Sequence, residues 1–129
     1  MKKIKSFAAA CKAKGLDPNK LPDVSMLPKE HQKSIVAFYM LTIIVSALNE
    51  GWQPNWSDEN EEKYYNWFCI KADKKRPSGF GFSDSNSYYG CDYADTHCGS
   101  RFYFKTRELA EYAREKFAKL YQDYFLLPN

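Results

Sequence analysis

Residues 90–100, GCDYADTHCGS, bring cysteine, aspartate and histidine side chains together in one short stretch. These side chains are common ligands of transition metals, so the stretch is a candidate metal site. The paired cysteines of a structural zinc site usually stand roughly two to four residues apart. Here six residues separate Cys91 from Cys98, and His97 directly precedes Cys98, where adjacent side chains rarely reach one ion. The spacing therefore favours a polar hairpin loop that holds no metal or other cofactor.

The other cysteines do not supply the second half of such a site. Cys11 and Cys69 lie far away in the sequence, and we expect them in a helix and a strand. A disulfide between Cys91 and Cys98 fits a hairpin, but a reducing cytosol disfavours it. Catalytic motifs are also missing from the sequence, which contains no nucleophile elbow, phosphate loop, zinc-protease helix or kinase set. We therefore expect a protein that is not an enzyme.

A second candidate site is the basic stretch KADKKRPSGFGFS at residues 71–83. It partly matches the RNP1 signature, in which bases stack on strand aromatics beside cationic side chains. Ser78 stands where that signature has a basic residue, and Ser83 stands where it has an aliphatic one. We favour a solvated turn followed by a core strand, and keep nucleic-acid binding as the alternative. The candidate nucleic-acid-binding residues are Lys71, Lys74, Lys75, Arg76, Phe80 and Phe82.

Aromatic residues make up 17% of the chain, and residues 52–104 hold all three tryptophans and most of the tyrosines. If the strand residues among them point away from the helices, they form an exposed platform, which usually marks a partner site. Alternatively, helices cover one sheet face and the aromatic loops cover the other. The sequence leaves these two interpretations open. The candidate protein-binding residues are Trp52, Trp56, Trp67, Tyr89 and Tyr103.

Apolar periodicity and caps predict two helices in the first half of the chain. Residues 3–14 form a short helix that Gly15 ends, and three prolines make residues 16–28 an extended connector. Residues 29–48 end in a stretch that is apolar nearly all round, which is typical of the most buried helix, and Gly51 is its expected left-handed cap.

Beyond residue 62 the apolar period changes to two, which predicts strands. The predicted strands are NWFCIKA (66–72), GFGFS (79–83) and RFYFK (101–105), with residues 86–93 as a candidate fourth strand. Turn-forming residues in KKRPSG (74–79) and DSNS (84–87) would join them as an antiparallel meander.

An amphipathic helix is predicted over residues 105–125, with Thr106 as its N-cap. Its expected inward stripe is Leu109, Ala113, Phe117, Leu120 and Tyr124. The predicted fold is α+β in the order α-α-β-β-β-α, with an antiparallel sheet of three to four strands packed against about three helices. We expect a single domain over residues 1–129, in which residues 1–27 form a short helix plus a Pro-rich connector.

The net charge is +3, which permits a nucleic-acid partner without arguing for one. The apolar part of the N-terminus is too short for an export signal, and Lys12 and Lys14 interrupt the residues after it. The longest apolar stretch, residues 35–48, is shorter than the ~18 residues that suggest a membrane span. We therefore expect a cytoplasmic protein that does not contact the membrane.

Four segments, ALNEGWQPNW (47–56), KYYNWF (63–68), SGFGFS (78–83) and GSRFYFKTRELAEYA (99–113), carry a resemblance. They resemble a group of uncharacterised small soluble proteins encoded by phages, prophages and mobile elements of gut bacteria. The similarity runs from about Val24 to the end of the chain. It implies a phage or mobile-element origin but no activity, and no catalytic residues can be carried over from it.

These observations predict a non-enzymatic accessory protein that acts as a protein–protein interaction module through an aromatic-rich surface. Interfaces favour Tyr, Trp and Phe, whereas phosphate binding needs concentrated Lys and Arg. The alternative is a single-stranded nucleic-acid-binding protein that uses the basic turn beside strand aromatics. The identity of the partner and the oligomeric state are open.

Overall fold

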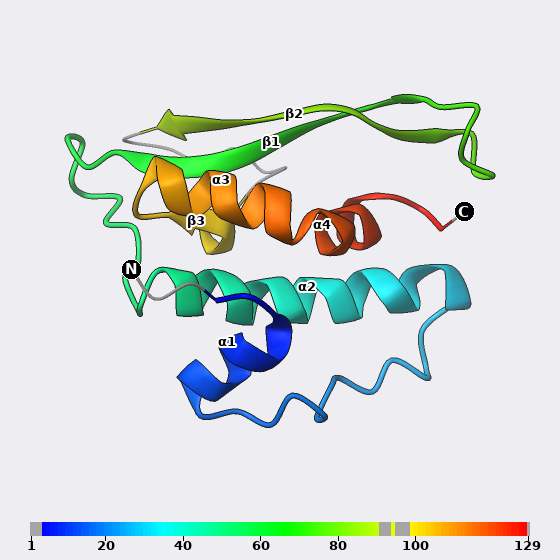
Figure 1. Ribbon diagram of the computed structural model, residues 1–129, viewed down its shortest axis with the longest axis horizontal. Helices are drawn as coiled ribbons and strands as arrows, with labels where there is room; N and C mark the ends of the chain where they lie inside the picture. Colours follow the sequence, from blue (N-terminus) through cyan, green and yellow to red (C-terminus); the bar gives the residue numbers. More distant parts are fainter. Residues whose placement is uncertain (1–3, 91–93, 95–98, 129) are drawn as a thin grey trace.

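The computed structural model describes residues 4–90, 94 and 99–128. The elements along the chain are α1 (Phe7–Lys14), α2 (Lys29–Leu48), β1 (Lys63–Ala72), β2 (Phe80–Gly90), the short 3-10 helix η1 (Ser100–Phe102), β3 (Tyr103–Phe104), α3 (Arg107–Lys116) and α4 (Ala118–Phe125). This order confirms the predicted α+β fold, with the last helix divided into two (Figure 1).

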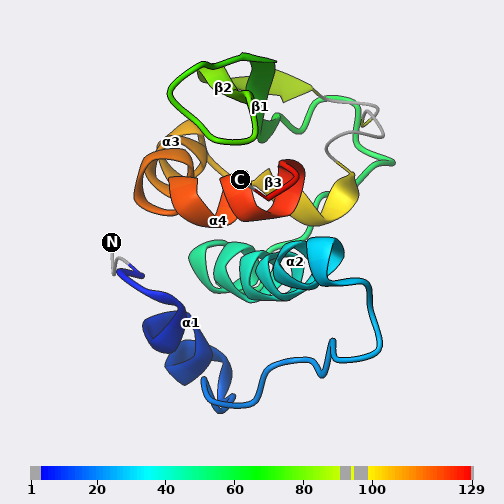
Figure 2. The same ribbon diagram turned by 90° about the vertical axis from the view of Figure 1, so that its right-hand side faces the viewer.

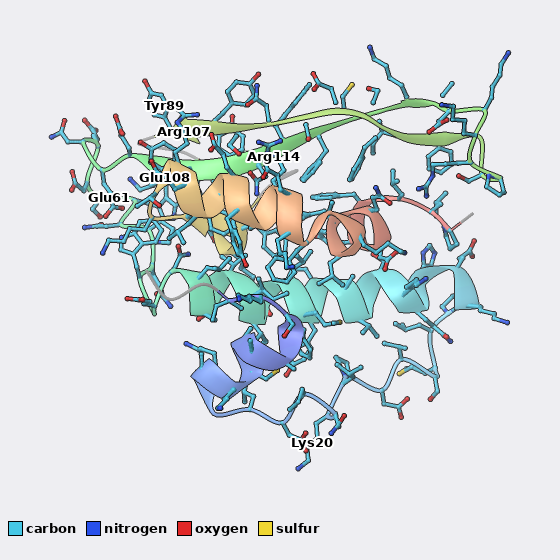
Figure 3. All side chains as sticks on the ribbon, in the orientation of Figure 1. Lys20, Glu61, Tyr89, Arg107, Glu108 and Arg114 are labelled. Atoms are coloured by element: carbon cyan, nitrogen blue, oxygen red, sulfur yellow. The ribbon has the colours of Figure 1, made fainter. Side chains whose placement is uncertain are left out.

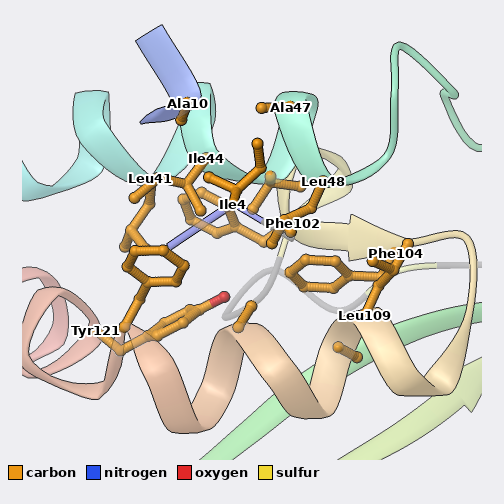
Figure 4. Close-up of a cluster of buried hydrophobic side chains, with 14 residues drawn as sticks. Ile4, Ala10, Leu41, Ile44, Ala47, Leu48, Phe102, Phe104, Leu109 and Tyr121 are labelled. Atoms are coloured by element: carbon orange, nitrogen blue, oxygen red, sulfur yellow. The ribbon is translucent and has the colours of Figure 1, made fainter. Parts of the chain in front are cut away.

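The elements stack in layers, which Figures 1 and 2 show from two sides. The sheet forms one outer layer, α3 and α4 lie beneath it, α2 lies beneath these, and α1 packs on the far side of α2. The core fills the space between α2 and the segment from η1 to α4. Figure 4 shows its labelled members, which are Ile4, Ala10, Leu41, Ile44, Ala47, Leu48, Phe102, Phe104, Leu109 and Tyr121.

Helix α1 begins at the N-cap Ser6, whose hydroxyl accepts a hydrogen bond from the Ala9 N–H at 3.1 Å. Gly15 ends it in the left-handed conformation, with φ at 71°, as the sequence predicts. Helix α2 ends differently from the prediction. Glu50 takes the first left-handed position (φ 51°), and Gly51 follows with its N–H bonded to the Ser46 carbonyl, which makes a Schellman-type ending.

Helix α2 is the central helix that the sequence predicts. Its 20 residues extend beyond the apolar stretch. Among the described residues, α2 is the one helix whose length and composition would suffice to cross a membrane. It packs against α1 on one side and against α4 and η1 on the other. Leu41 and Ile44 are fully buried there, so packing inside the protein accounts for its apolar composition.

The sheet is antiparallel, in the order β2-β1-β3. The predicted separate fourth strand at residues 86–93 is wrong as far as Gly90, because Asn86 to Gly90 continue β2. The last residues of that prediction, 91–93, lie outside the described residues. DSNS is not a turn, because residues 84–87 lie inside β2 and pair with β1. A register shift at Cys69/Ile70 absorbs one extra residue as a bulge and keeps both halves paired. KKRPSG does form the turn between β1 and β2, as predicted.

The final helix breaks at Phe117, whose backbone (φ −112°, ψ 27°) leaves the helical range. Thr106 caps the start of α3 as predicted, accepting from the Leu109 N–H at 3.2 Å. The break changes which residue of α4 points inward. Tyr121 is buried, whereas Leu120 and Tyr124 of the predicted stripe are partly buried at the margin of the core.

Candidate protein-binding site

The two faces of the sheet have different neighbours. Side chains alternate between faces along a strand, so Tyr64, Asn66 and Phe68 of β1 share one face. That face meets the helices, because Phe68 packs on Tyr121 with ring centroids 5.0 Å apart and Asn66 contacts the Tyr121 hydroxyl. The opposite face, called the outer face here, carries Tyr65 and Trp67. No described helix lies over the part of the outer face that β1 and β2 form (Figures 1 and 2), whereas at β3 residues of α2 line one pocket with Tyr103.

Five aromatic rings cross the outer face in mutual contact, and we call them the aromatic row. In order of contact they are Trp56, Tyr103, Tyr65, Tyr88 and Trp67. The successive centroid distances are 5.1, 5.4, 6.2 and 6.2 Å, all within the range of favourable aromatic pairs. Strand pairing creates the row, because Tyr65 lies opposite Tyr88 on β2 and Tyr103 on β3.

Exposure differs between the members of the aromatic row. Tyr103 is only 2% exposed because Trp56 packs edge-on against its ring. Tyr65 and Trp67 are half-buried, and Tyr88 is 45% exposed. The row is therefore anchored in the fold at Tyr103 and opens to solvent at Tyr88.

The segment before β1 covers one end of the outer face, and buried Lys63 fixes it there. The Lys63 ammonium donates to the carbonyls of Asp58 (3.0 Å) and Glu61 (2.9 Å) and lies 5.2 Å from the Trp56 ring centroid. The Glu61 carboxylate accepts from the Asn55 N–H at 2.7 Å and lies 3.5 Å from the Lys63 ammonium. The outer face is thus divided into a loop-covered end and an open end.

A pocket of about 470 Å³ adjoins the covered end of the aromatic row. Trp52, Trp56 and Tyr103 form its aromatic walls, and exposed Arg101 lies at its margin. The volume is that of a small-molecule or side-chain pocket. Three of the predicted protein-binding residues therefore meet around one concavity.

The five predicted protein-binding residues do not all share a surface. Trp67 and Tyr103 lie in the aromatic row, and Trp56 joins it from the loop. Tyr89 does not, because it lies opposite Tyr64 and therefore on the helix-facing side, 54% exposed at the end of β2.

Sequence reasoning missed Tyr65 and Tyr88, the central members of the row. The alternation that placed Trp67 outward also places Tyr65 outward, so that signal was present. The placement of Tyr88 could be predicted only from the full length of β2, and the interpretation of DSNS as a turn made the predicted strand too short.

The predicted nucleic-acid-binding residues separate into two groups. Lys71, Lys74 and Lys75 are exposed near the β1–β2 turn. Phe82 faces the helices and stacks on Phe68 with a centroid distance of 4.6 Å, so its ring serves packing. Phe80 is half-buried opposite Ala72.

Arg76 folds back toward the helices. Its Nη1 lies 3.4 Å from the Gln122 side-chain oxygen of α4, and its Cδ would lie 2.6 Å from a Cβ added at Gly81. Gly81 therefore leaves the space that the Arg76 side chain occupies. The basic turn and the strand aromatics do not form one stacking surface.

A polar network joins the helix-facing side of the sheet to α3, from which Arg107 and Arg114 point toward the sheet (Figure 3). Ser87, 1% exposed, donates to the Asn66 side-chain oxygen at 2.7 Å and accepts from the Arg114 Nε at 3.2 Å. Arg107 donates to the Ser87 carbonyl at 2.9 Å, and its guanidinium lies 5.3 Å from the Tyr64 ring centroid. Buried polar groups that satisfy one another fix the register of packed layers. The network therefore holds the sheet on α3 and presents the outer face to solvent.

One titratable group of the sheet with a shifted pKa is Tyr64. A hydrogen bond from the Tyr64 hydroxyl to the Glu62 carboxylate raises the pKa of Tyr64 above its ordinary value, with desolvation adding to the effect. The shift stabilises the neutral phenol and gives Tyr64 no reactive character. Among the described residues, no cluster of three His, Cys, Asp or Glu side chains suits a metal ion. Cys91, His97 and Cys98 lie outside the described residues, so the prediction for that stretch stays a prediction.

No protein-family model, curated protein or solved structure matches the chain.

Proposed function

We propose that the protein is a non-enzymatic protein-binding module that holds its partner on the outer face of the sheet. The observation that carries this proposal is the aromatic row, five rings in contact on a sheet face whose β1–β2 part no described helix covers. Aromatic side chains dominate the binding energy of protein interfaces because they bury large areas at a low entropic cost.

The division of the row into packed and accessible rings suits a binding surface. Tyr103 and Trp56 are held by packing, so the row is organised before any partner arrives. Tyr65, Tyr88 and Trp67 offer the accessible ring surface. The pocket between Trp52, Trp56 and Tyr103 lies at one end of the row and has the size to accept a side chain of the partner.

Nucleic acid is the less supported partner. Base stacking needs an exposed ring beside cations, and Phe82 packs on Phe68 away from the outer face. The exposed lysines of the β1–β2 turn are few, in keeping with a net charge of +3. Fluorescent single-stranded DNA and RNA oligonucleotides at low salt test this alternative. Binding that falls steeply with added salt would favour it over the protein partner.

The protein-binding proposal is tested with peptides selected from a displayed random library against the immobilised full chain. We expect Tyr88→Ser to weaken binding of the selected peptides at least about tenfold, as at an interface hot spot. Tyr88 is 45% exposed, so its loss opens no core cavity, and circular dichroism checks that the fold remains.

The matched control is Met26→Ser, because Met26 is 88% exposed in the connector and equally able to attract peptides non-specifically. We expect this change to leave the affinity within about twofold. Recovery of no binding peptide, or peptides that depend on Met26 and not on Tyr88, contradicts the proposal.

We also propose a phage or mobile-element origin and a place in the bacterial host cytoplasm. The support is the resemblance of four segments between residues 47 and 113 to proteins of such elements. The genes beside the coding sequence test it. Virion or mobilisation genes agree with it, and a set of host housekeeping genes opposes it.

A further inference from the structure

Among the described residues, most of β1 has a free backbone edge on one side. β3 pairs with Tyr64 and Tyr65 alone, and the chain before β3 turns away through η1. On that side of β1, residues 66–72 therefore have no described strand beside them, although β2 pairs with them on the other side.

The register identifies which backbone groups face this edge. On β3, the Tyr103 carbonyl and the Lys105 N–H bond the Asn49 side chain, so these groups point away from β1. Directions alternate along an antiparallel strand, so Phe104 and its partner Tyr64 direct their N–H and C=O groups at each other.

Counting along β1 by twos from Tyr64, the residues Asn66, Phe68 and Ile70 direct their backbone groups into the free edge. No hydrogen bond joins these groups to the part of the chain that the structure describes. Unpaired donors and acceptors in this arrangement are a template for an additional strand.

Side chains close the opposite edge of the sheet. On β2, the Asp84 carboxylate accepts from the Ser85 N–H and the Asn86 amide oxygen accepts from the Ser87 N–H, both at 2.8 Å. Arg107 donates to the Ser87 carbonyl at 2.9 Å. These contacts and the bulge in β2 are devices that blunt an edge strand. The contrast leaves the β1 edge as the open one among the described strands.

An apolar groove of about 260 Å³ runs beside the free edge. Its lining residues are Asn66, Trp67, Phe68, Ile70, Phe82 and Phe125. Ile70 is 49% exposed there, although its side chain is large and apolar. A strand added at the edge would place every second side chain into this groove and the others beside Trp67 on the outer face.

The charges beside the groove indicate the partner's chemistry. Lys71, Lys74 and Lys75 are exposed near the end of β1, and none forms an ion pair with a described residue. Acidic residues on a bound segment would complement them. β1 itself, KYYNWFCIKA, contains no acidic residue, so a second copy of β1 does not supply that complement.

We propose that the free edge of β1 binds an extended segment of a protein partner as an added strand. The segment carries apolar side chains at alternate positions and acidic residues at the end nearest Lys71. In this mode main-chain hydrogen bonds provide affinity, and the groove selects the side chains. The inference rests on the proposed protein-binding function and specifies the form in which the partner binds.

The test compares two substitutions of Ile70 for binding of peptides from a displayed random library. Ile70→Pro removes an N–H that faces the free edge and leaves the N–H groups that face β2. Ile70→Thr is the matched control, because it keeps the N–H and the β-branched shape. We expect Ile70→Pro to weaken binding at least about thirtyfold and Ile70→Thr less than about fivefold. The selected peptides should alternate apolar and polar residues and carry Asp or Glu at one end.

Three results overturn the strand-addition proposal. If Tyr88→Ser weakens binding and Ile70→Pro does not, the partner uses the outer face alone and the protein-binding function stands. If neither change matters, both proposals fall. If the chain forms dimers that Ile70→Pro disperses, measured by light scattering after gel filtration, the edge belongs to a second copy. Circular dichroism and thermal unfolding verify that Ile70→Pro remains folded.

Discussion

One side chain, that of Asn49, hydrogen-bonds backbone groups of the β3 segment that have no described strand beside them. The Asn49 amide donates to the Tyr103 carbonyl at 2.9 Å and accepts from the Lys105 N–H at 3.0 Å, so it occupies the place of a neighbouring strand. Asn49 is buried at the end of α2, directly before the left-handed Glu50. It therefore links the central helix to the strand that carries Tyr103.

Asn49→Ala is predicted to lower the free energy of unfolding by about 2–4 kcal/mol, because two backbone groups lose their partners in a buried place. Urea unfolding measures the change. Asn19→Ala removes the same amide from an exposed position of the connector and should stay within about 0.5 kcal/mol of the original chain. Equal effects of the two changes would show that the Asn49 contacts do not stabilise β3.

Cys11 and Cys69 are predicted to differ in reactivity. Burial against α2, with Asp17 adding a smaller effect, raises the pKa of the Cys11 thiol, so little thiolate forms near neutral pH. In a chain that carries Cys91→Ser and Cys98→Ser, iodoacetamide should modify Cys11 at least about tenfold more slowly than half-buried Cys69. Mass spectrometry of the two peptides measures both rates, and equal rates would contradict the burial of Cys11.

The same shift predicts a pH dependence of stability. A raised pKa means that the folded chain keeps the Cys11 proton at a pH where the unfolded chain loses it. The free energy of unfolding therefore falls as pH rises above the ordinary thiol value of 9.0, and the stabilisation is fully present below it. Cys11→Ala should remove this part of the slope in urea titrations repeated across that pH range. An unchanged slope would assign it to other groups.

At the scale of elements, the segment between α2 and β1 owes its position to Lys63. This lysine is fully buried and holds two loop carbonyls while its ammonium lies over the Trp56 ring. Trp56 in turn covers Tyr103, so one cation organises the anchored end of the aromatic row. The cost of burying this charge is offset by hydrogen bonds and the Glu61 carboxylate.

Lys63→Met is predicted to release the loop while keeping the length of the side chain. Unfolding should require about 2 kcal/mol less, and tryptophan emission should shift to the red as Trp56 meets water. Lys105→Met, at an exposed lysine near β3, is the control and should change neither value appreciably. An unshifted emission in Lys63→Met would mean that Trp56 is held by Tyr103 alone.

The sequence predicted the helices and strands better than the positions at which they end, turn or break. Helical and two-residue periods identified α2, most of β1, the first part of β2 and the α+β order, because burial of one face imposes those periods. The interpretation of DSNS as a turn was wrong. Its four polar residues resemble a turn, but the side chains of Asp84 and Asn86 accept hydrogen bonds from backbone N–H groups within β2. The break at Phe117 has no Gly or Pro beside it in the sequence, so the helical period alone did not predict it.

At the scale of the whole molecule, the stacking of the layers leaves the outer face of the sheet available to the proposed partner. α1, α2, α3 and α4 stack beneath the sheet (Figure 2), so the outer face lies on the opposite side and the free edge of β1 runs along its margin, beside Phe125 of α4. The candidate site required long-range pairing that a sequence does not specify, since Trp56, Tyr65, Tyr88 and Tyr103 meet only after three strands and a loop assemble. The aromatic composition predicted an aromatic surface, and the strand register determines which residues form it.

Nuclear magnetic resonance mapping of a selected peptide on the isotopically labelled full chain is the most direct test of partner binding at the sheet. Strand addition predicts that amide shifts concentrate on β1 and on Tyr88 of β2. The amides of Phe68 and Ile70, which exchange with solvent quickly in the free chain, should exchange at least about tenfold more slowly with peptide bound. Shifts confined to α1, α2 or the connector, with unchanged exchange at Phe68 and Ile70, would contradict it.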